Sequence, residues 1–226
     1  MRLLALDTAT EACSAALLVD GAVSHRWTCA PQQHAGLILP MLEALLDEAG
    51  MSVAALDGLA FGRGPGSFTG LRIAAGVAQG IAFVADLPVV RISTLAAMAQ
   101  QALESEPEAA VIAALDARMG QVYWGVYTAD EGGLARPLSG EGVSDPAAVK
   151  PPAAGPCWGV GSGFASYGEI LAEAIGHGLV ASDPGLLPDA RFMLELGARD
   201  LRAGLGVVAE AALPVYLRDS VAAHPG

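Results

Sequence analysis

GRGPGSFTGLRIA, residues 62–74, is the most informative stretch of this sequence. The apolar residues 59–61 before it predict a short buried strand, and the alanine-rich run after it predicts a helix from Thr69 to Ala85. Glycine tolerates positive φ and, lacking a Cβ, lets a second backbone or a ligand approach closely. The stretch therefore predicts a strand, a tight glycine loop and a helix N-terminus in succession.

This loop has two interpretations. It could bind an anion, because helix amides and the helix dipole point the same way, with Ser67 or Thr69 capping the helix. Motif shape alone favours a tight turn, because no lysine follows the loop and its glycine spacing matches neither GxGxxG nor GxSxG. The residues of the possible ligand loop are Asp7, Thr8, Gly64, Gly66, Ser67 and Thr69.

Three strings of the sequence together resemble the TsaB family, also called YeaZ. They are DTAT at residues 7–10, GPGSFTGLR at 64–72 and PVYLR at 214–218, and the likeness extends over nearly the whole chain. The resemblance implies an α/β, actin-like (ribonuclease H-like) fold of two domains, each a mixed sheet with flanking helices. It also implies a role in making threonylcarbamoyladenosine on tRNA, as the non-catalytic partner of a larger paralogue, TsaD.

From this resemblance we expect a cytoplasmic scaffold that activates a TsaD-like partner. That partner transfers threonylcarbamoyl to N6 of the tRNA adenosine beside the anticodon, and a TsaE-like ATPase joins the complex. ATP and a divalent metal are expected on the partner proteins, with no cofactor on this chain. The chain alone is expected to form a homodimer and to meet tRNA only through the complex.

The alternative is a stand-alone enzyme, either an actin-like ATP-dependent phosphotransferase or a glycoprotease-type metallopeptidase. ATP-using relatives read DxGT where this chain reads DTAT, and Ala9 adds a Cβ where a phosphate would approach. Asp7 and Thr8 therefore bind a ligand or cap a turn at the strand end. Against the peptidase, the four histidines form no HxxxH pair, which is the usual spacing of two metal ligands on a helix. They are His25, His34, His177 and His224.

Composition limits the possible partners and compartments. With 24 acidic and 12 basic residues the formal charge is −12, which repels phosphate backbones. Only 16% of residues are charged and mean hydropathy is +0.46, so we expect another subunit to cover some apolar surface. Three cysteines without CxxC are typical of a reducing cytosol. We expect no signal peptide and no membrane span, since the uncharged run between Arg72 and Asp86 is shorter than the ~20 residues required.

Small residues recur through the helix predicted at Thr69–Ala85. Glycine destabilises a helix by about 1 kcal/mol relative to alanine, so the presence of Gly76 and Gly80 within this helix has to be explained by a contact that needs a small residue. Either they contact the chain's own backbone, or they form a seam with another subunit, together with an amphipathic helix His34–Ala49 that bends at Pro40. We favour the seam. The predicted partner interface comprises Leu37, Ile38, Met41, Leu45, Gly70, Ala74, Gly76, Ala78 and Gly80.

The charged, proline-bearing residues 104–108 predict a domain boundary. We expect an N-terminal domain at 1–105 with a returning helix near 188–203, a smaller C-terminal domain at 106–187, and a loose tail at 219–226. The second half repeats the opening pattern, because the strand Val111–Asp116 also ends in an acid. Asp116 could be catalytic, or it could cap a turn or pair with Arg118.

Overall fold

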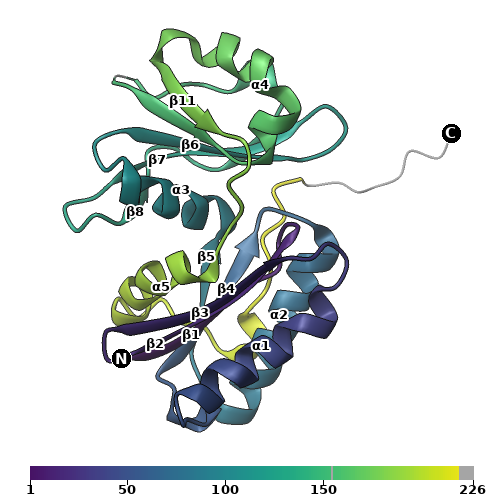
Figure 1. The fold of residues 1–226 in the computed structure, drawn as a ribbon, viewed down its shortest axis with the longest axis vertical. Coiled ribbons are helices and arrows are strands. Elements are labelled where there is room, and N and C mark those ends of the chain that lie inside the picture. The colour runs from purple at the N-terminus through teal and green to yellow at the C-terminus, as the bar shows by residue number, and fades with distance from the viewer. Residues whose placement is uncertain (154, 219–226) are drawn as a thin grey trace, which may run out of the picture.

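The computed structural model describes residues 1–153 and 155–218, and it contains two mixed β-sheets stacked along the long axis of the molecule (Figure 1). The first sheet has the order β3-β2-β1-β4-β5. Its antiparallel strands are β1 (Arg2–Asp7), β2 (Ala12–Val19) and β3 (Ala22–Cys29), and β4 (Gly58–Gly64) and β5 (Val89–Ser93) run parallel to β1. The strand predicted at residues 59–61 lies within β4.

The second sheet repeats the topology of the first. Its order is β8-β7-β6-β10-β11, with β6 antiparallel to β7 and parallel to β10, as β1 is to β2 and β4. Its strands are β6 (Ala110–Asp116), β7 (Val122–Ala129), β8 (Ala135–Pro137), β9 (Gly142–Ser144), β10 (Cys157–Val160) and β11 (Leu179–Asp183). This duplication confirms the predicted actin-like α/β fold. The short strands β8, β9 and β11 carry no apolar alternation and were not predicted.

The helices cover both faces of the first sheet (Figure 1). Helices α1 (His34–Glu48) and α2 (Phe68–Ala85) lie side by side on one face, and α5 (Met193–Arg202) lies on the other. Helix α1 continues through Pro40, as predicted, and α4 (Ser162–Ile175) lies against the second sheet. Single 3-10 turns occur at Val53–Ala55, Pro146–Ala148, Gly176–Gly178, Ala190–Phe192 and Ala209–Ala211.

Two helices are exchanged between the sheets. Helix α3 (Thr94–Ser105) follows the first sheet in sequence but contacts β6, β7 and β8 of the second, whereas α5 follows the second sheet and contacts β1, β4 and β5 of the first. One buried apolar cluster consequently includes Leu3 and Val90 from the first sheet and Val111 and Val160 from the second. By its contacts, α3 belongs with the second sheet although it lies within residues 1–105.

Helix α2 is long and apolar enough, by its 18 residues and mean hydropathy of 1.4, to meet the composition of a membrane-spanning helix. About a third of this helix is buried (33%), on the face that packs on the sheet beside α1. The residues of α2 that are buried are Gly70, Leu71, Ala74, Ala75, Ala78 and Ala82. The helix is therefore part of the core of the first domain.

Candidate functional site

The glycine loop lies directly on the DTAT turn. The amide of Ser67 donates to the Ala9 carbonyl oxygen at 2.7 Å, and the Thr8 hydroxyl donates to the Gly70 carbonyl oxygen at 2.7 Å. A Cβ added at Gly66 would lie 2.4 Å from the Ala9 oxygen, and one at Gly70 would lie 1.9 Å from the Thr8 oxygen. These two glycines are therefore required for contact between two backbone segments of the same chain.

The start of α2 is capped by Ser67. Its hydroxyl oxygen accepts from the Gly70 amide at 3.4 Å, so Ser67 is the cap and Thr69 is not. Gly64 has a φ of 107°, and an added Cβ there would lie 3.0 Å from the Val215 carbonyl oxygen. The loop is thus held by contacts on both sides, from the DTAT turn and from the C-terminal segment.

Asp7 is a fully buried carboxyl at the end of β1. Its Oδ1 accepts from the Ala9 amide at 2.9 Å, and its Oδ2 has no hydrogen-bond partner among the described residues. Burial raises the pKa of Asp7 to about 7, and the nearby Asp189 adds to the rise. A Cβ at Gly62 would lie 1.8 Å from Oδ2, so the carboxyl lies directly against β4. Of the two roles predicted for Asp7, this geometry supports the turn cap.

The C-terminal string PVYLR lies beside the glycine loop, although about 150 residues separate the two in sequence. The Val215 amide donates to the Arg63 carbonyl oxygen at 2.8 Å. The rings of Phe68 and Tyr216 lie 5.4 Å apart, and the Arg72 guanidinium lies 3.8 Å above the Phe68 ring. The two longest family-like strings of the sequence therefore meet in one place, which we call the motif junction.

Arg218 extends the motif junction to the second domain. Its guanidinium donates to Gln121 Oε1 at 2.6 Å and approaches the Met119 sulfur at 3.6 Å. Arg118, Met119 and Gly120 all have positive φ, in the turn between β6 and β7. Asp116 caps this turn through the Arg118 amide at 2.8 Å and pairs with the Arg118 side chain at 3.4 Å. Both structural roles predicted for Asp116 are present.

A partly buried polar network joins the two domains beside the glycine loop. The Arg63 side chain pairs with Glu141 at 3.2 Å, and the buried Tyr127 hydroxyl donates to the other oxygen of Glu141 at 2.6 Å. Burial first, and then the Glu141 charge, raise the pKa of Tyr127 well above its usual value. Sequence reasoning missed Glu141, because it lies in an irregular segment with no pattern of its own.

The predicted partner interface divides into buried and exposed residues. Five of its members belong to the chain's own core, which corrects the prediction for them: Ile38, Leu45, Gly70, Ala74 and Ala78. Leu37 and Met41 are partly buried. Gly76 and Gly80 are exposed, and an added Cβ would meet nothing within 4 Å at either position. Contact with the chain's own backbone therefore does not explain these two glycines.

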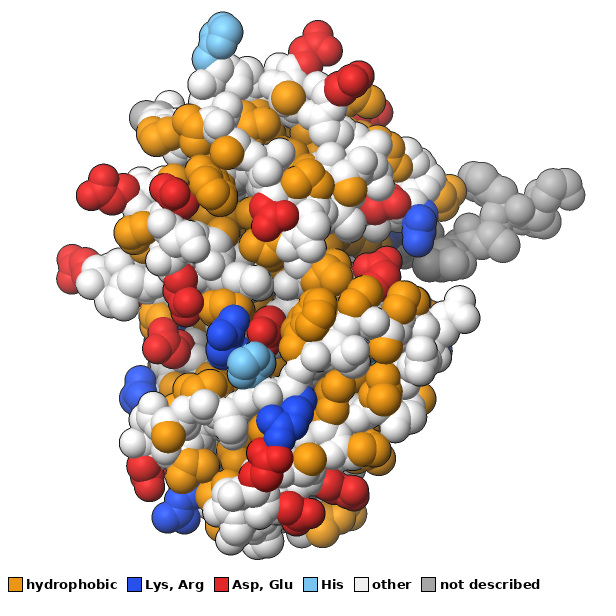
Figure 2. All heavy atoms as spheres, viewed as in Figure 1, with side chains coloured by type: hydrophobic (Ala, Val, Ile, Leu, Met, Phe, Trp, Pro, Cys, Tyr) orange, Lys and Arg blue, Asp and Glu red, His pale blue; other side chains and the backbone are white. Residues whose placement is uncertain are grey.

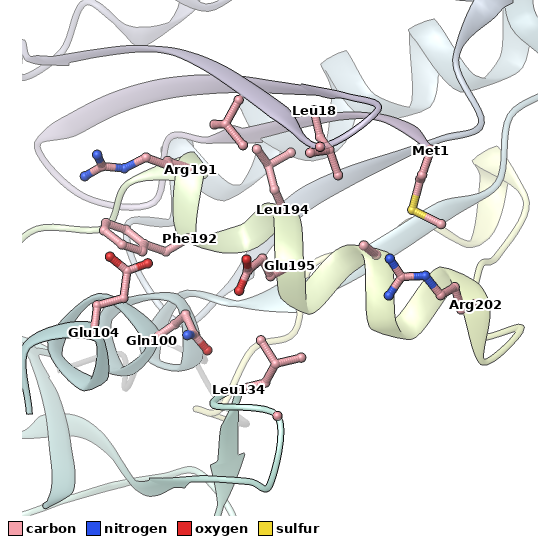
Figure 3. Close-up of a pocket in the computed structure, with 14 residues that line it drawn as sticks. Met1, Leu18, Gln100, Glu104, Leu134, Arg191, Phe192, Leu194, Glu195 and Arg202 are labelled. Carbon is pink, nitrogen blue, oxygen red and sulfur yellow. The ribbon is translucent and has the colours of Figure 1, made fainter. Parts of the chain in front are cut away.

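A groove of about 600 Å³ lies on another side of the molecule, between the exchanged helices α3 and α5 (Figure 3). Glu104 from α3 and Glu195 from α5 point into the gap, with Arg191 at one end and Arg202 at the other. Burial raises the pKa of Glu104, while the neighbouring Arg191 lowers it. No sequence prediction fell on this groove, since its lining comes from five separate segments.

No group of three potential metal-ligating side chains occurs within residues 1–153 and 155–218. His34 lies buried with its Nε2 3.2 Å from the Ala12 carbonyl oxygen, and His224 falls outside the described residues.

The repeated sheets and the exchanged helices define a two-domain actin-like protein, in which the DTAT turn lies against the chain's own glycine loop. A model of the family described as TsaD, tRNA N6-adenosine threonylcarbamoyltransferase, matches residues 28–224. The tRNA threonylcarbamoyladenosine biosynthesis protein TsaB of Escherichia coli is 44% identical over 98% of this chain and 96% of its own length. The protein of that name from Haemophilus influenzae is 42% identical over 98% of this chain and 95% of its own length.

A solved structure of YeaZ from Pseudomonas aeruginosa is 46% identical and superposes with a TM-score of 0.89 over 96% of this chain and 99% of its own. The chain therefore belongs to the TsaB (YeaZ) family, as its motifs predicted.

Proposed function

We propose that this protein acts in tRNA threonylcarbamoyladenosine biosynthesis as a non-catalytic subunit that binds and activates a TsaD-like partner. The names of its close relatives support the pathway. One observation supports the non-catalytic role: the DTAT turn contacts the chain's own glycine loop, at Ala9 and Thr8, where a nucleotide phosphate would have to lie.

The proposed partner surface is the outer face of α1 and α2. Gly76, Gly80 and Val84 are four residues apart and form an exposed row along the C-terminal half of α2. Hydrophobic side chains gather over this part of the first domain (Figure 2), and Val84 and the adjacent Phe83 are 81% and 73% exposed. Exposed apolar side chains in such a row are typical of a protein–protein interface.

The exposed glycines explain how a second helix could fit. Without a Cβ at Gly76 and Gly80, a partner helix can approach α2 to about 8 Å rather than 10 Å. We propose that a homodimer and the heterodimer with the TsaD-like partner both use this face, so that the two pairings exclude one another. A TsaE-like ATPase would join the heterodimer. The protein would work in the cytoplasm without a cofactor of its own, with ATP and metal bound by its partners.

The test is Gly76→Arg, measured by co-purification with the TsaD-like partner, by light scattering and by threonylcarbamoyladenosine content in cells lacking the native copy. Gly168→Arg is the matched control, because Gly168 lies in α4 and an added Cβ there also meets nothing within 4 Å. We expect the first variant to be a folded monomer without partner binding or modification, and the control to behave as wild type. A Gly76→Arg protein that still binds the partner would rule out this face.

The stand-alone enzyme remains the second candidate, and it predicts measurable chemistry by the chain alone. Micromolar ATP affinity or metal-dependent peptidase activity of the purified protein would establish it and would overturn the non-catalytic role.

A further inference from the structure

The motif junction leaves an unusual set of side chains at the surface. Phe68 and Tyr216 are 49% and 45% exposed, although each is aromatic and each lies in one of the two longest family-like strings. Met119, which Arg218 contacts, is 87% exposed. Arg72 contacts Phe68, which contacts Tyr216, and two residues further along the chain Arg218 contacts Met119 of the second domain. We call these five residues the cationic–aromatic strip.

The strip carries positive charge that the described part of the protein does not neutralise. The chain has only 12 Lys and Arg against 24 acids, yet neither Arg72 nor Arg218 pairs with a carboxylate of the described residues. The strip also borders the N-terminus of α2, where the helix dipole adds partial positive charge. An anionic partner would therefore be attracted here and repelled by most of the remaining surface.

The geometry of the strip suits a nucleic acid. The Arg72 guanidinium lies over the Phe68 ring at 3.8 Å, which leaves the N–H groups along its edge free to donate to a phosphate. Half-exposed rings provide stacking surfaces for unpaired bases, and stacking beside arginine is a common way in which proteins bind single strands. An acidic protein segment would use the charge but not the exposed ring faces.

We propose that the cationic–aromatic strip binds single-stranded RNA, namely the unpaired loop of the tRNA substrate. This inference rests on the proposed function, because the pathway supplies the RNA. The strip begins at the end of the α2 row that we assign to the partner protein, so an RNA held there would lie beside that partner. Its contribution is a weak contact that adds to the binding surface of the complex.

The test uses the full chain and a fluorescent anticodon stem–loop RNA, with anisotropy titrations from about 20 mM salt upward, because phosphate contacts weaken steeply with salt. We expect Arg72→Gln and Arg218→Gln each to weaken binding roughly 3- to 10-fold at low salt. Each should also reduce, by about one, the slope of the logarithm of the binding constant against the logarithm of the salt concentration. We expect Phe68→Ala and Tyr216→Ala to weaken it roughly 5-fold or more with the slope unchanged. Arg91→Gln, an exposed arginine on β5, removes the same charge and should change the affinity by less than about 2-fold.

Three outcomes would overturn the inference. One is no RNA binding by the wild-type chain even at the lowest salt. The second is an equal effect of Arg91→Gln and Arg72→Gln, which would show non-specific charge attraction. The third is that the Arg72 and Phe68 variants still bind RNA but no longer bind the TsaD-like partner, which would make the strip a protein interface. Partner binding is measured separately for each variant, so a failure here is distinguishable from a failure of the proposed function.

Discussion

The Thr8 hydroxyl donates to the carbonyl oxygen of Gly70 at 2.7 Å, and both residues are buried although 62 positions separate them. This bond fastens the first turn of α2 to the turn that ends β1. In an actin-like domain the β1–β2 turn is the place where a phosphate would be bound, and here the chain's own helix lies against it. The small size of Gly70 makes this contact possible, because a Cβ there would lie 1.9 Å from the Thr8 oxygen.

Two glycines of α2 should respond oppositely to the same substitution. Gly70→Ala places a methyl group against the Thr8 backbone, and we expect it to destabilise the protein by roughly 2 to 4 kcal/mol through forced displacement. Gly76→Ala adds a methyl group in open space and should stabilise the protein by up to about 1 kcal/mol through helix propensity. Urea unfolding of both variants measures the difference. Equal effects would show that α2 does not contact the DTAT turn as described.

The stability of the protein should depend on the ionisation of Asp7. Its pKa is about 7 in the fold and near 3.8 when unfolded, so its contribution to stability is fully present below about pH 4 and is lost as the pH rises through 7. Asp7→Asn removes this titration while its amide oxygen can still accept from Ala9. We expect the variant to gain up to about 4 kcal/mol over wild type between about pH 4 and pH 8.

The measurement for Asp7 is urea unfolding of both proteins across that pH range. Asp57→Asn is the control, because Asp57 also accepts a backbone amide, from Arg2, but at an exposed site. A parallel pH dependence of wild type and Asp7→Asn would show that Asp7 is ionised in the fold.

The three cysteines should differ in reactivity. Cys29 is exposed, whereas Cys13 and Cys157 are buried, and burial raises the pKa of the Cys13 thiol to about 11, with the Asp7 charge adding to the rise. Because the thiolate is the reactive form, only Cys29 should react quickly with a thiol reagent in the native protein. Cys29→Ser should remove the fast phase, and denaturant should expose the remaining two thiols. A fast phase that survives in Cys29→Ser would contradict the burial of β2 and β10.

Glu141 should matter for stability because it accepts from both domains. Glu141→Ala leaves the Arg63 guanidinium and the buried Tyr127 hydroxyl without their acceptor, which should cost roughly 1 to 3 kcal/mol. Glu141→Gln should cost less, since its carbonyl oxygen can still accept from Tyr127. Glu131→Ala, at an exposed turn, is the control and should lie within about 0.5 kcal/mol of wild type. Equal unfolding midpoints for all three variants would exclude a stabilising role for this network.

The sequence alone was sufficient for the elements with strong local signals. The apolar residues 59–61 predicted β4, the strand predicted at Val111–Asp116 corresponds to β6, and the amphipathic pattern of His34–Ala49 predicted that α1 continues through Pro40. The actin-like fold also followed from the sequence, because its motif strings are long. These features depend on neighbouring residues, whose preferences are readable along the chain.

Tertiary structure alone decided which side of α2 faces the core. Gly70 and Gly76 are identical residues of one helix, and only their surroundings show that the first packs against Thr8 while the second meets open space. The meeting of Phe68 with Tyr216, the bridge from Arg63 through Glu141 to Tyr127, and the exchange of α3 and α5 are likewise contacts between distant segments. No local pattern encodes such contacts, because they arise only when two separately formed turns or sheets are brought together by burial of the surface between them.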